Sequence, residues 1–273
     1  MRDPRLTGRV ALVTGANHGI GAAISRELAR HGVHVVAAYL RMTPTDLDSE
    51  HYPAAYGEAR GTTADALVAA IKAQGGTAIA AEADLRAPDA AAALFDLAEE
   101  TFGPVEILVN NASAWKADTF APLEADRFGR PHSAMTPAVH DFVFAIDARA
   151  SAMLIAEFAT RHTARAADWG RIIGIGSGGT SGFPGEVSYG AAKAAMQSYT
   201  LSAAHELWPH GVTANVILPP AVDTGWISAE TRAAIEAGGP GSRVARPEDI
   251  AEVVGMFVSE EARFVTGQVI AVR

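Results

Sequence analysis

The 273-residue chain contains no cysteine, which excludes a disulfide scaffold and thiolate chemistry. It also lacks long apolar runs, and no segment approaches the roughly 18 apolar residues that indicate a membrane-spanning helix. Residues 1–8 are polar and have no apolar stretch of the kind found in a signal peptide. We therefore expect a cytoplasmic protein with no membrane partner.

Basic residues are scarce: 22 Lys and Arg stand against 31 Asp and Glu, giving a formal net charge of −9. Proteins that bind nucleic acids normally carry a basic patch or stripe, and this chain has no run of Lys or Arg. The acidity favours solubility and indicates little about other partners. We predict no nucleic-acid partner and no metal site.

Short apolar runs alternate with longer helical patterns along the chain. The predicted strands are 9–14, 33–39, 77–83, 107–110, 171–176, 213–218 and 267–272. The predicted helices are 19–31, 63–74, 89–102, 137–166, 188–208 and 247–258. This alternation predicts an α/β fold, with a parallel sheet of about seven strands and helices on both faces. We expect a single doubly wound, Rossmann-like domain over residues 1–273.

Two longer segments interrupt the alternation, at about 42–62 and 115–136. Each follows a predicted strand, at the carboxyl end where ligands bind in open parallel sheets. Loops of this length in a compact domain are usually functional or disordered. We interpret both as irregular insertions.

The first predicted strand runs directly into a glycine-rich turn, TGANHGIG, and then into a helix. Gly15 allows the tight turn, Gly19 lets the backbone approach a diphosphate, and Gly21 allows the helix to pack closely on the strand. The free N–H groups at the start of the helix attract phosphate. The strand–turn–helix context therefore predicts a nucleotide site.

Further motifs follow in a fixed order. Asp84-Leu85 comes after the third strand, the sequence NNAS at 110–113 after the fourth, and Ser177 after the fifth. Twelve residues later comes YGAAK at 189–193, and residues 219–224 follow the sixth strand. Together with the TGxxxGxG turn, this set resembles the short-chain dehydrogenase/reductase family from Gly8 to about Val269. The resemblance implies NAD(P)-dependent hydride transfer between a carbonyl and an alcohol.

Tyr189 and Lys193 lie four residues apart on one predicted helix and so share a face. A tyrosine with a pKa near 10 is a poor base at neutral pH, and a nearby ammonium lowers that pKa. Tyr189 is therefore the predicted proton donor and acceptor. By resemblance, Lys193 also hydrogen-bonds the nicotinamide ribose, and Ser177 hydrogen-bonds the substrate carbonyl.

Asp147 departs from the family pattern, which usually has a catalytic Asn at this point. An ionised carboxylate accepts hydrogen bonds but cannot donate them. Asp147 could hold a water against Lys193 and raise the pKa of that lysine. It could equally pair with Arg149 or another cation and be structural. We include it among the candidate catalytic residues.

The end of the second predicted strand bears on the choice of cofactor. NAD-specific relatives usually carry an acidic residue there, whereas this chain has Tyr39, with Arg41 two residues on and His18 in the glycine turn. Because arginine suits phosphate recognition, we predict NADP(H), with NAD less favoured. The resemblance assigns the adenine amino group to Asp84 and the carboxamide to Val222 and Thr224. The full predicted cofactor set is Gly15, Asn17, His18, Gly19, Ile20, Gly21, Tyr39, Arg41, Asp84, Leu85, Asn110, Ala112, Tyr189, Lys193, Pro219, Val222 and Thr224.

The predicted function is an NADP(H)-dependent oxidoreductase acting on a small carbonyl or alcohol. A 3-oxoacyl-thioester reductase, a pteridine-type reductase and a non-catalytic NADP sensor are the alternatives. Aromatic residues that could line an apolar substrate pocket are Trp115, Phe120, Phe128, Phe183 and Trp226. The resemblance also implies a homodimer or homotetramer, assembled through the helices around 141–165 and 188–208.

Overall fold

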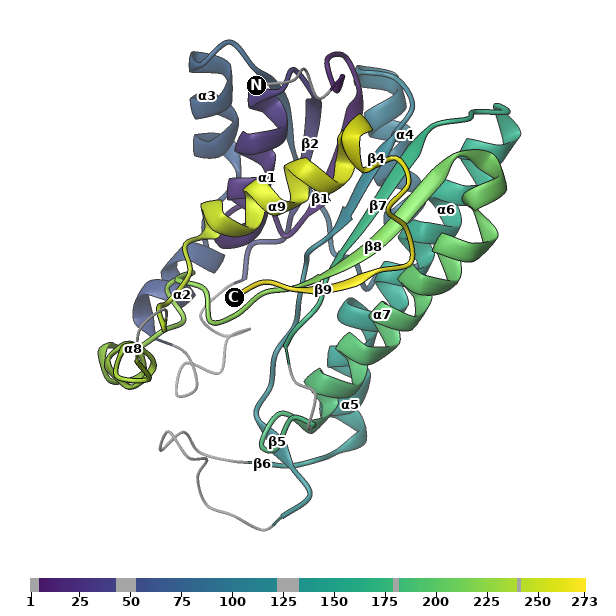
Figure 1. Ribbon diagram of the computed structural model, residues 1–273. Helices are drawn as coiled ribbons and strands as arrows, with labels where there is room; N and C mark the ends of the chain where they lie inside the picture. Colours follow the sequence, from purple (N-terminus) through teal and green to yellow (C-terminus); the bar gives the residue numbers. More distant parts are fainter. Residues whose placement is uncertain (1–4, 43–52, 122–132, 179–181, 240–241) are drawn as a thin grey trace.

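A seven-stranded parallel sheet forms the centre of the protein (Figure 1). The computed structural model describes residues 5–42, 53–121, 133–178, 182–239 and 242–273. The strands lie in the order β3-β2-β1-β4-β7-β8-β9. Their bounds are β1 (Val10–Thr14), β2 (His34–Tyr39), β3 (Thr77–Glu82), β4 (Ile107–Asn110), β7 (Gly170–Ile175), β8 (Val212–Leu218) and β9 (Val269–Ala271). The order reverses between β1 and β4, and such a reversal is where ligands bind in open α/β sheets.

Both faces of the sheet are buried, which explains the nearly continuous apolar strands. In β1, Ala11 and Val13 point into one hydrophobic core, and Val10 and Leu12 point into the other. Each core is closed by a layer of helices.

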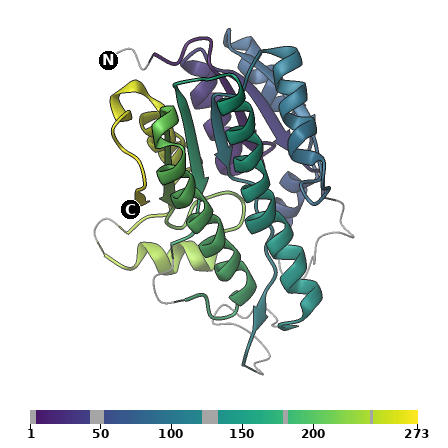
Figure 2. The ribbon, with the colours of Figure 1, turned by 90° about the vertical axis from the view of Figure 1, so that its right-hand side faces the viewer.

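Within the described residues, three helices cover each face. The first layer contains α1 (Gly19–Arg30), α3 (Asp65–Ala73) and α9 (Pro247–Val258). The second contains α4 (Ala90–Thr101), α6 (Ser151–Ala164) and α7 (Val187–Glu206), and Figure 2 looks onto this layer. The predicted fold class, a doubly wound Rossmann-like sheet with helices on both faces, is confirmed. No helix in the described part of the chain combines the length and apolar character needed to cross a bilayer.

The long helix predicted at 137–166 has three parts. It consists of α5 (Pro137–Phe144), a π-helical turn (Ala145–Ala150) and α6, which follow one another without a break. Thr136 caps its start by accepting a hydrogen bond from the Val139 N–H at 3.2 Å. π-Helical turns occur often at functional sites, and this one contains Asp147.

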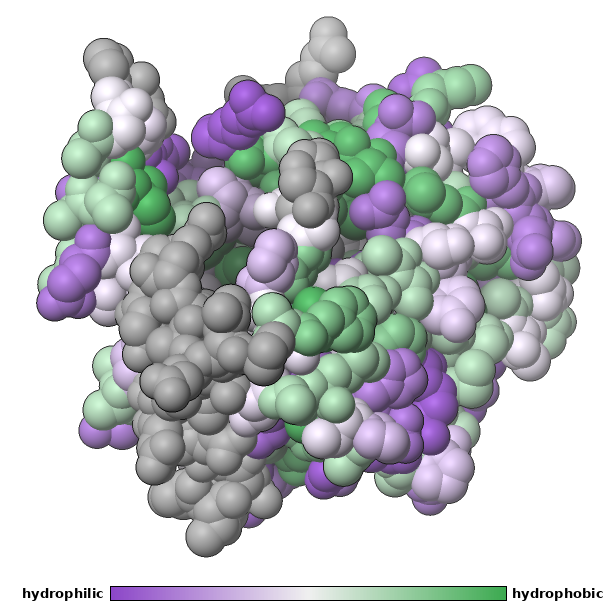
Figure 3. Space-filling model, turned by 90° about the horizontal axis from the view of Figure 1, so that it is seen from below, coloured by the Kyte–Doolittle hydropathy of each residue, from purple (hydrophilic) through white to green (hydrophobic). Residues whose placement is uncertain are grey.

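Several short elements were not predicted. Residues 42–62 contain the helix α2 (Ala54–Arg60), residues 115–136 contain the short strands β5 (Asp118–Thr119) and β6 (Ser133–Ala134), and α8 (Ala229–Glu236) follows β8. All of them gather at the carboxyl end of the sheet, the lower end in Figure 1. Figure 3 views this end and shows hydrophobic residues interspersed with hydrophilic ones. Phe128 lies outside the described residues.

Candidate active site

A cleft of about 2030 Å³ opens at the carboxyl end of the sheet. Typical small-molecule pockets enclose about 300–1,000 Å³, so this cleft has room for a dinucleotide together with a second molecule. Its lining includes most of the residues predicted from the sequence. These are Gly15, Asn17, His18, Gly19, Ile20, Tyr39, Asp84, Leu85, Ala112, Ser177, Tyr189, Lys193, Pro219, Val222 and Thr224.

The glycine turn is held by residues that follow β4. Asn111 donates through its side-chain amide to the carbonyls of Thr14 at 2.8 Å and Gly15 at 3.1 Å. The Thr14 hydroxyl in turn accepts the backbone N–H groups of Asn111 and Ala112. A Cβ at Gly21 would lie 2.2 Å from the Gly15 carbonyl oxygen, so only glycine fits there. Asn111 was overlooked as a site residue, although its place in the NNAS motif was a usable signal.

The start of α1 fits a dinucleotide diphosphate. The side chain of His18, the residue before the helix, makes no capping hydrogen bond, so it leaves the first N–H groups of α1 to other acceptors. Gly19 faces Thr224 across a narrow gap, because an added Cβ would lie 3.0 Å from the threonine methyl carbon. A diphosphate binds to backbone N–H groups that have no other acceptor. It can approach them only where no side chain stands in the way.

Helix α2 lies against the glycine turn. The Asn17 amide donates to the carbonyls of Thr62 at 3.0 Å and Ala59 at 3.4 Å. Tyr56 of α2 packs edge-on against His18 and Trp226, with ring centroids 5.4 and 5.1 Å apart. Helix α2 therefore forms one side of the cleft, through Tyr56 and Arg60.

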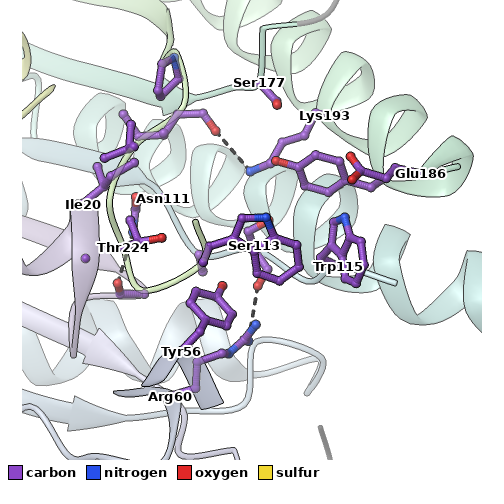
Figure 4. A pocket seen from close by; sticks show the side chains of 18 of the residues that line it. Ile20, Tyr56, Arg60, Asn111, Ser113, Trp115, Ser177, Glu186, Lys193 and Thr224 are labelled. Carbon is purple, nitrogen blue, oxygen red and sulfur yellow. Dashed lines mark hydrogen bonds between the residues drawn. The ribbon is translucent and has the colours of Figure 1, made fainter. Parts of the chain in front are cut away.

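Lys193 extends from α7 into the cleft (Figure 4). Its Nζ donates to the Ile175 carbonyl at 3.1 Å and lies 2.9 Å from Asp147 Oδ1. The same Nζ lies 5.8 Å from the centre of the Tyr189 ring. Ser177, two residues beyond the end of β7, lines the same cleft as Tyr189 and contributes to lowering the pKa of that tyrosine. The structure thus brings Ser177, Tyr189, Lys193 and Asp147 together.

The environment of Tyr189 favours the protonated phenol. Burial raises its pKa most, Lys193 lowers it, and the Asp147 charge raises it again, so the net shift is upward. The lowering effect predicted for the ammonium is present but is outweighed by burial. At neutral pH, Tyr189 is therefore a neutral phenol, which carries a proton that it can donate.

Lys193 is a buried ammonium with a matched counter-ion. Burial alone would lower its pKa, but the charges of Asp147 and Tyr189 and the Asp147 hydrogen bond raise it overall. Lys193 therefore keeps its charge at neutral pH despite its burial.

Asp147 is buried, and both of its carboxylate oxygens accept hydrogen bonds. It accepts the Ser113 hydroxyl and the Ala114 backbone N–H, each at 2.7 Å, in addition to pairing with Lys193. Arg149, the other partner considered, donates instead to the Arg86 carbonyl at 2.9 Å. Asp147 thus pairs with Lys193 and raises the pKa of that lysine, so both interpretations are met in part, and a role of Asp147 in catalysis stays a prediction.

Three predicted cofactor residues do not line the cleft. Gly21 packs beneath the turn. Asn110 is buried, with its amide donating to the Ser151 carbonyl at 3.4 Å. Arg41 is exposed, and its Nε donates to both carboxylate oxygens of Glu82 at 2.9 and 3.1 Å. Their assignment to the cofactor stays a prediction.

Asp118, in the segment predicted as irregular, fixes the start of the helix that carries Tyr189. Its carboxylate accepts the Ser188 backbone N–H at 3.0 Å and also the Ser188 hydroxyl. Its own N–H donates to the Gly185 carbonyl at 3.1 Å. The Asp118 side chain is buried and acts as a helix cap supplied from a distant segment. No local sequence pattern signals this contact, because 70 residues separate the two partners.

Replacing Asp118 by alanine is expected to lower the free energy of unfolding by about 2 kcal/mol or more, because it leaves the buried Ser188 donors unmatched. Turnover should fall as well, since Tyr189 follows Ser188 directly. Urea denaturation and steady-state kinetics measure the two effects. Asp141→Ala, at a side chain 79% exposed, is the matched control and should change neither. Equal stability of Asp118→Ala and wild type would contradict this role.

A doubly wound sheet with a glycine turn at its switch point defines a dinucleotide-binding α/β protein. The family model described as enoyl-(acyl carrier protein) reductase matches residues 54–273. A short-chain type dehydrogenase/reductase of Picea abies is 32% identical, over 98% of this chain and 92% of the relative. The cis-4-hydroxycyclohexanecarboxylate dehydrogenase of Sinomonas cyclohexanicum is 34% identical, over 97% of this chain and 94% of the relative.

Solved structures agree with these relatives. A short-chain dehydrogenase from Burkholderia cenocepacia J2315, in complex with NADP, superposes with a TM-score of 0.79 at 30% identity, covering 98% of this chain and 97% of that one. The protein belongs to the short-chain dehydrogenase/reductase family and is an NAD(P)-dependent oxidoreductase, as its motifs predicted.

Proposed function

We propose that the protein is an NADP(H)-dependent carbonyl reductase that interconverts a ketone or aldehyde with the corresponding alcohol. The observation that carries the proposal is the convergence of Ser177, Tyr189 and Lys193 on one wall of the cleft, with the lysine charge held by Asp147. Each is the residue type that its proposed step requires.

The nicotinamide supplies a hydride when it is bound in the cleft. Ser177 donates a hydrogen bond to the substrate carbonyl oxygen and so places it beside the Tyr189 hydroxyl. Tyr189, a neutral phenol because of its raised pKa, gives its proton to that oxygen as negative charge develops. The Lys193 ammonium stabilises the phenolate that remains. Asp147 keeps Lys193 charged and fixes its position.

The cofactor would be held mainly by backbone. Gly15 and Gly19 allow the turn to approach the diphosphate, and Thr224 closes over Gly19. Among the described residues at the end of β2, the cleft is lined by Tyr39, Leu40 and Met42, none of which has a carboxylate to bind a ribose 2′-hydroxyl. This absence supports NADP(H) over NAD(H), and so does the likeness to a structure in complex with NADP.

The assembly stays a prediction. Large hydrophobic side chains are exposed at Met153 on α6 and Tyr199 on α7, the helices through which we predicted a homodimer or homotetramer. Burial of such exposed apolar side chains between two copies of the chain would favour association. Light scattering of the purified protein measures the assembly, and a monomer would contradict it.

Titration of the purified protein with NADPH and NADH tests the cofactor assignment. We expect NADPH to bind at least about tenfold more tightly, the equivalent of one well-placed phosphate contact. A panel of ketones and aldehydes, assayed by NADPH oxidation, then tests the chemistry. Tighter binding of NADH would refute the NADP(H) assignment. Tight binding without turnover on any carbonyl would instead favour a cofactor sensor.

A further inference from the structure

The carboxyl-terminal end of α2 is anchored beside the nucleotide turn. The Arg60 carbonyl accepts the Met42 N–H at 3.0 Å, which ties the end of α2 to the segment that follows β2. The neighbouring carbonyls of Ala59 and Thr62 accept the Asn17 amide of the glycine turn. The backbone of Arg60 is therefore held in place at the edge of the cleft.

The Arg60 side chain extends from α2 towards the end of β4 (Figure 4). Its Nη2 donates to the Ser113 carbonyl at 3.4 Å, and its guanidinium carbon lies 5.7 Å from the centre of the Tyr56 ring. Arg60 lines the same cleft as the glycine turn and Lys193. The Arg60 side chain thus borders the space proposed for the cofactor.

The Arg60 charge lacks a counter-ion within the described residues. It forms no ion pair there, and its one hydrogen bond is a long one to a neutral carbonyl. A guanidinium has five N–H donors, and a half-buried one without an anion is costly. An anionic group entering the cleft would satisfy it with charge-assisted hydrogen bonds.

The other two cations predicted to bind phosphate are less suited to it. Arg41 is already paired with Glu82 and does not line the cleft. Burial, helped by the Arg60 charge, lowers the pKa of His18 to about 4, so its imidazole is neutral at pH 7. Arg60 is the cation at this end of the cleft that is both charged and unpaired among the described residues.

We propose that Arg60, carried by the inserted helix α2, binds a phosphate group of the dinucleotide. This rests on the proposed function, because it presumes that the cleft holds a pyridine dinucleotide. Two phosphates share the required chemistry: the diphosphate bridge, common to NADH and NADPH, and the 2′-phosphate, present on NADPH alone.

Fluorescence titration of Arg60→Gln with NADPH and NADH tests the inference without depending on turnover. We expect the Kd for NADPH to rise at least about tenfold, the size of one charge-assisted contact. A matching rise for NADH assigns the contact to the diphosphate, whereas a rise for NADPH alone assigns it to the 2′-phosphate. Arg60→Lys keeps the charge but loses the forked donors, and should lie between wild type and Arg60→Gln.

Arg263→Gln is the matched control, since it removes the same charge at an exposed site outside the cleft. It should leave both Kd values within about twofold of wild type. If wild type binds the nucleotides and Arg60→Gln binds them equally well, the inference is overturned and the proposed function stands. If wild type binds neither nucleotide, both are overturned.

Discussion

Tyr189→Phe is expected to lower kcat by about 100- to 10,000-fold, the usual contribution of a positioned proton donor. The phenylalanine ring keeps the packing of Tyr189 but has no proton to transfer. Because Lys193 remains paired with Asp147, the cleft should keep its shape and charge. The Kd for NADPH should therefore stay within about twofold of wild type.

Tyr199→Phe is the matched control for this variant. Tyr199 lies on the same helix, α7, but its side chain is exposed, so the loss of its hydroxyl should leave kcat unchanged. Stopped-flow measurement of a single turnover with saturating NADPH separates the chemical step from product release. A Tyr189→Phe enzyme with wild-type single-turnover rates would refute Tyr189 as the proton donor.

Asp147→Ala is expected to lower the free energy of unfolding by about 3–5 kcal/mol, the cost of leaving a buried charge without its partner. Three groups lose their acceptor at once: the Lys193 ammonium, the Ser113 hydroxyl and the Ala114 N–H. Activity should fall too, because Lys193 then loses both its position and the interaction that keeps it charged. Urea denaturation and kinetics measure the two losses.

The pH dependence of stability gives a second signature. In the wild type the pKa of Lys193 is raised above its ordinary value of 10.5. The stabilisation from this group is thus complete below 10.5 and is lost as the pH rises through the folded-state pKa. In Asp147→Ala, burial dominates and lowers the pKa of Lys193, so the unfolded state binds more protons and stability rises with pH. The difference between the two proteins should therefore shrink as the pH is raised towards 10.

Asp147→Asn serves as the conservative comparison. The amide keeps the shape and one acceptor oxygen for Lys193 but carries no charge. We expect a smaller loss of stability than in Asp147→Ala. A stability for Asp147→Ala within about 1 kcal/mol of wild type would refute a structural Asp147–Lys193 pair.

The sequence by itself determined the architecture. Apolar runs such as residues 9–14 become strands buried on both faces, and the glycine turn lies where β1 meets α1. These features are local, since periodicity and glycine positions act over a few residues. The four-residue spacing of Tyr189 and Lys193 likewise places both on one face of α7. Local patterns were therefore enough for the family and for placing the candidate catalytic pair on one helix.

Only the tertiary structure decided which charges are matched. Asp147 pairs with Lys193 rather than Arg149 because the π-helical turn and α7 pack together, and nothing near Asp147 in the sequence records that contact. The sequence predicted Arg41 as a phosphate ligand, whereas in the structure its guanidinium binds Glu82 of β3. Arg60 lay in a segment without a periodic pattern and reaches the cleft because α2 folds onto the glycine turn. Ion pairs depend on distances across the fold, and residues far apart in sequence set those distances only after the helices have packed.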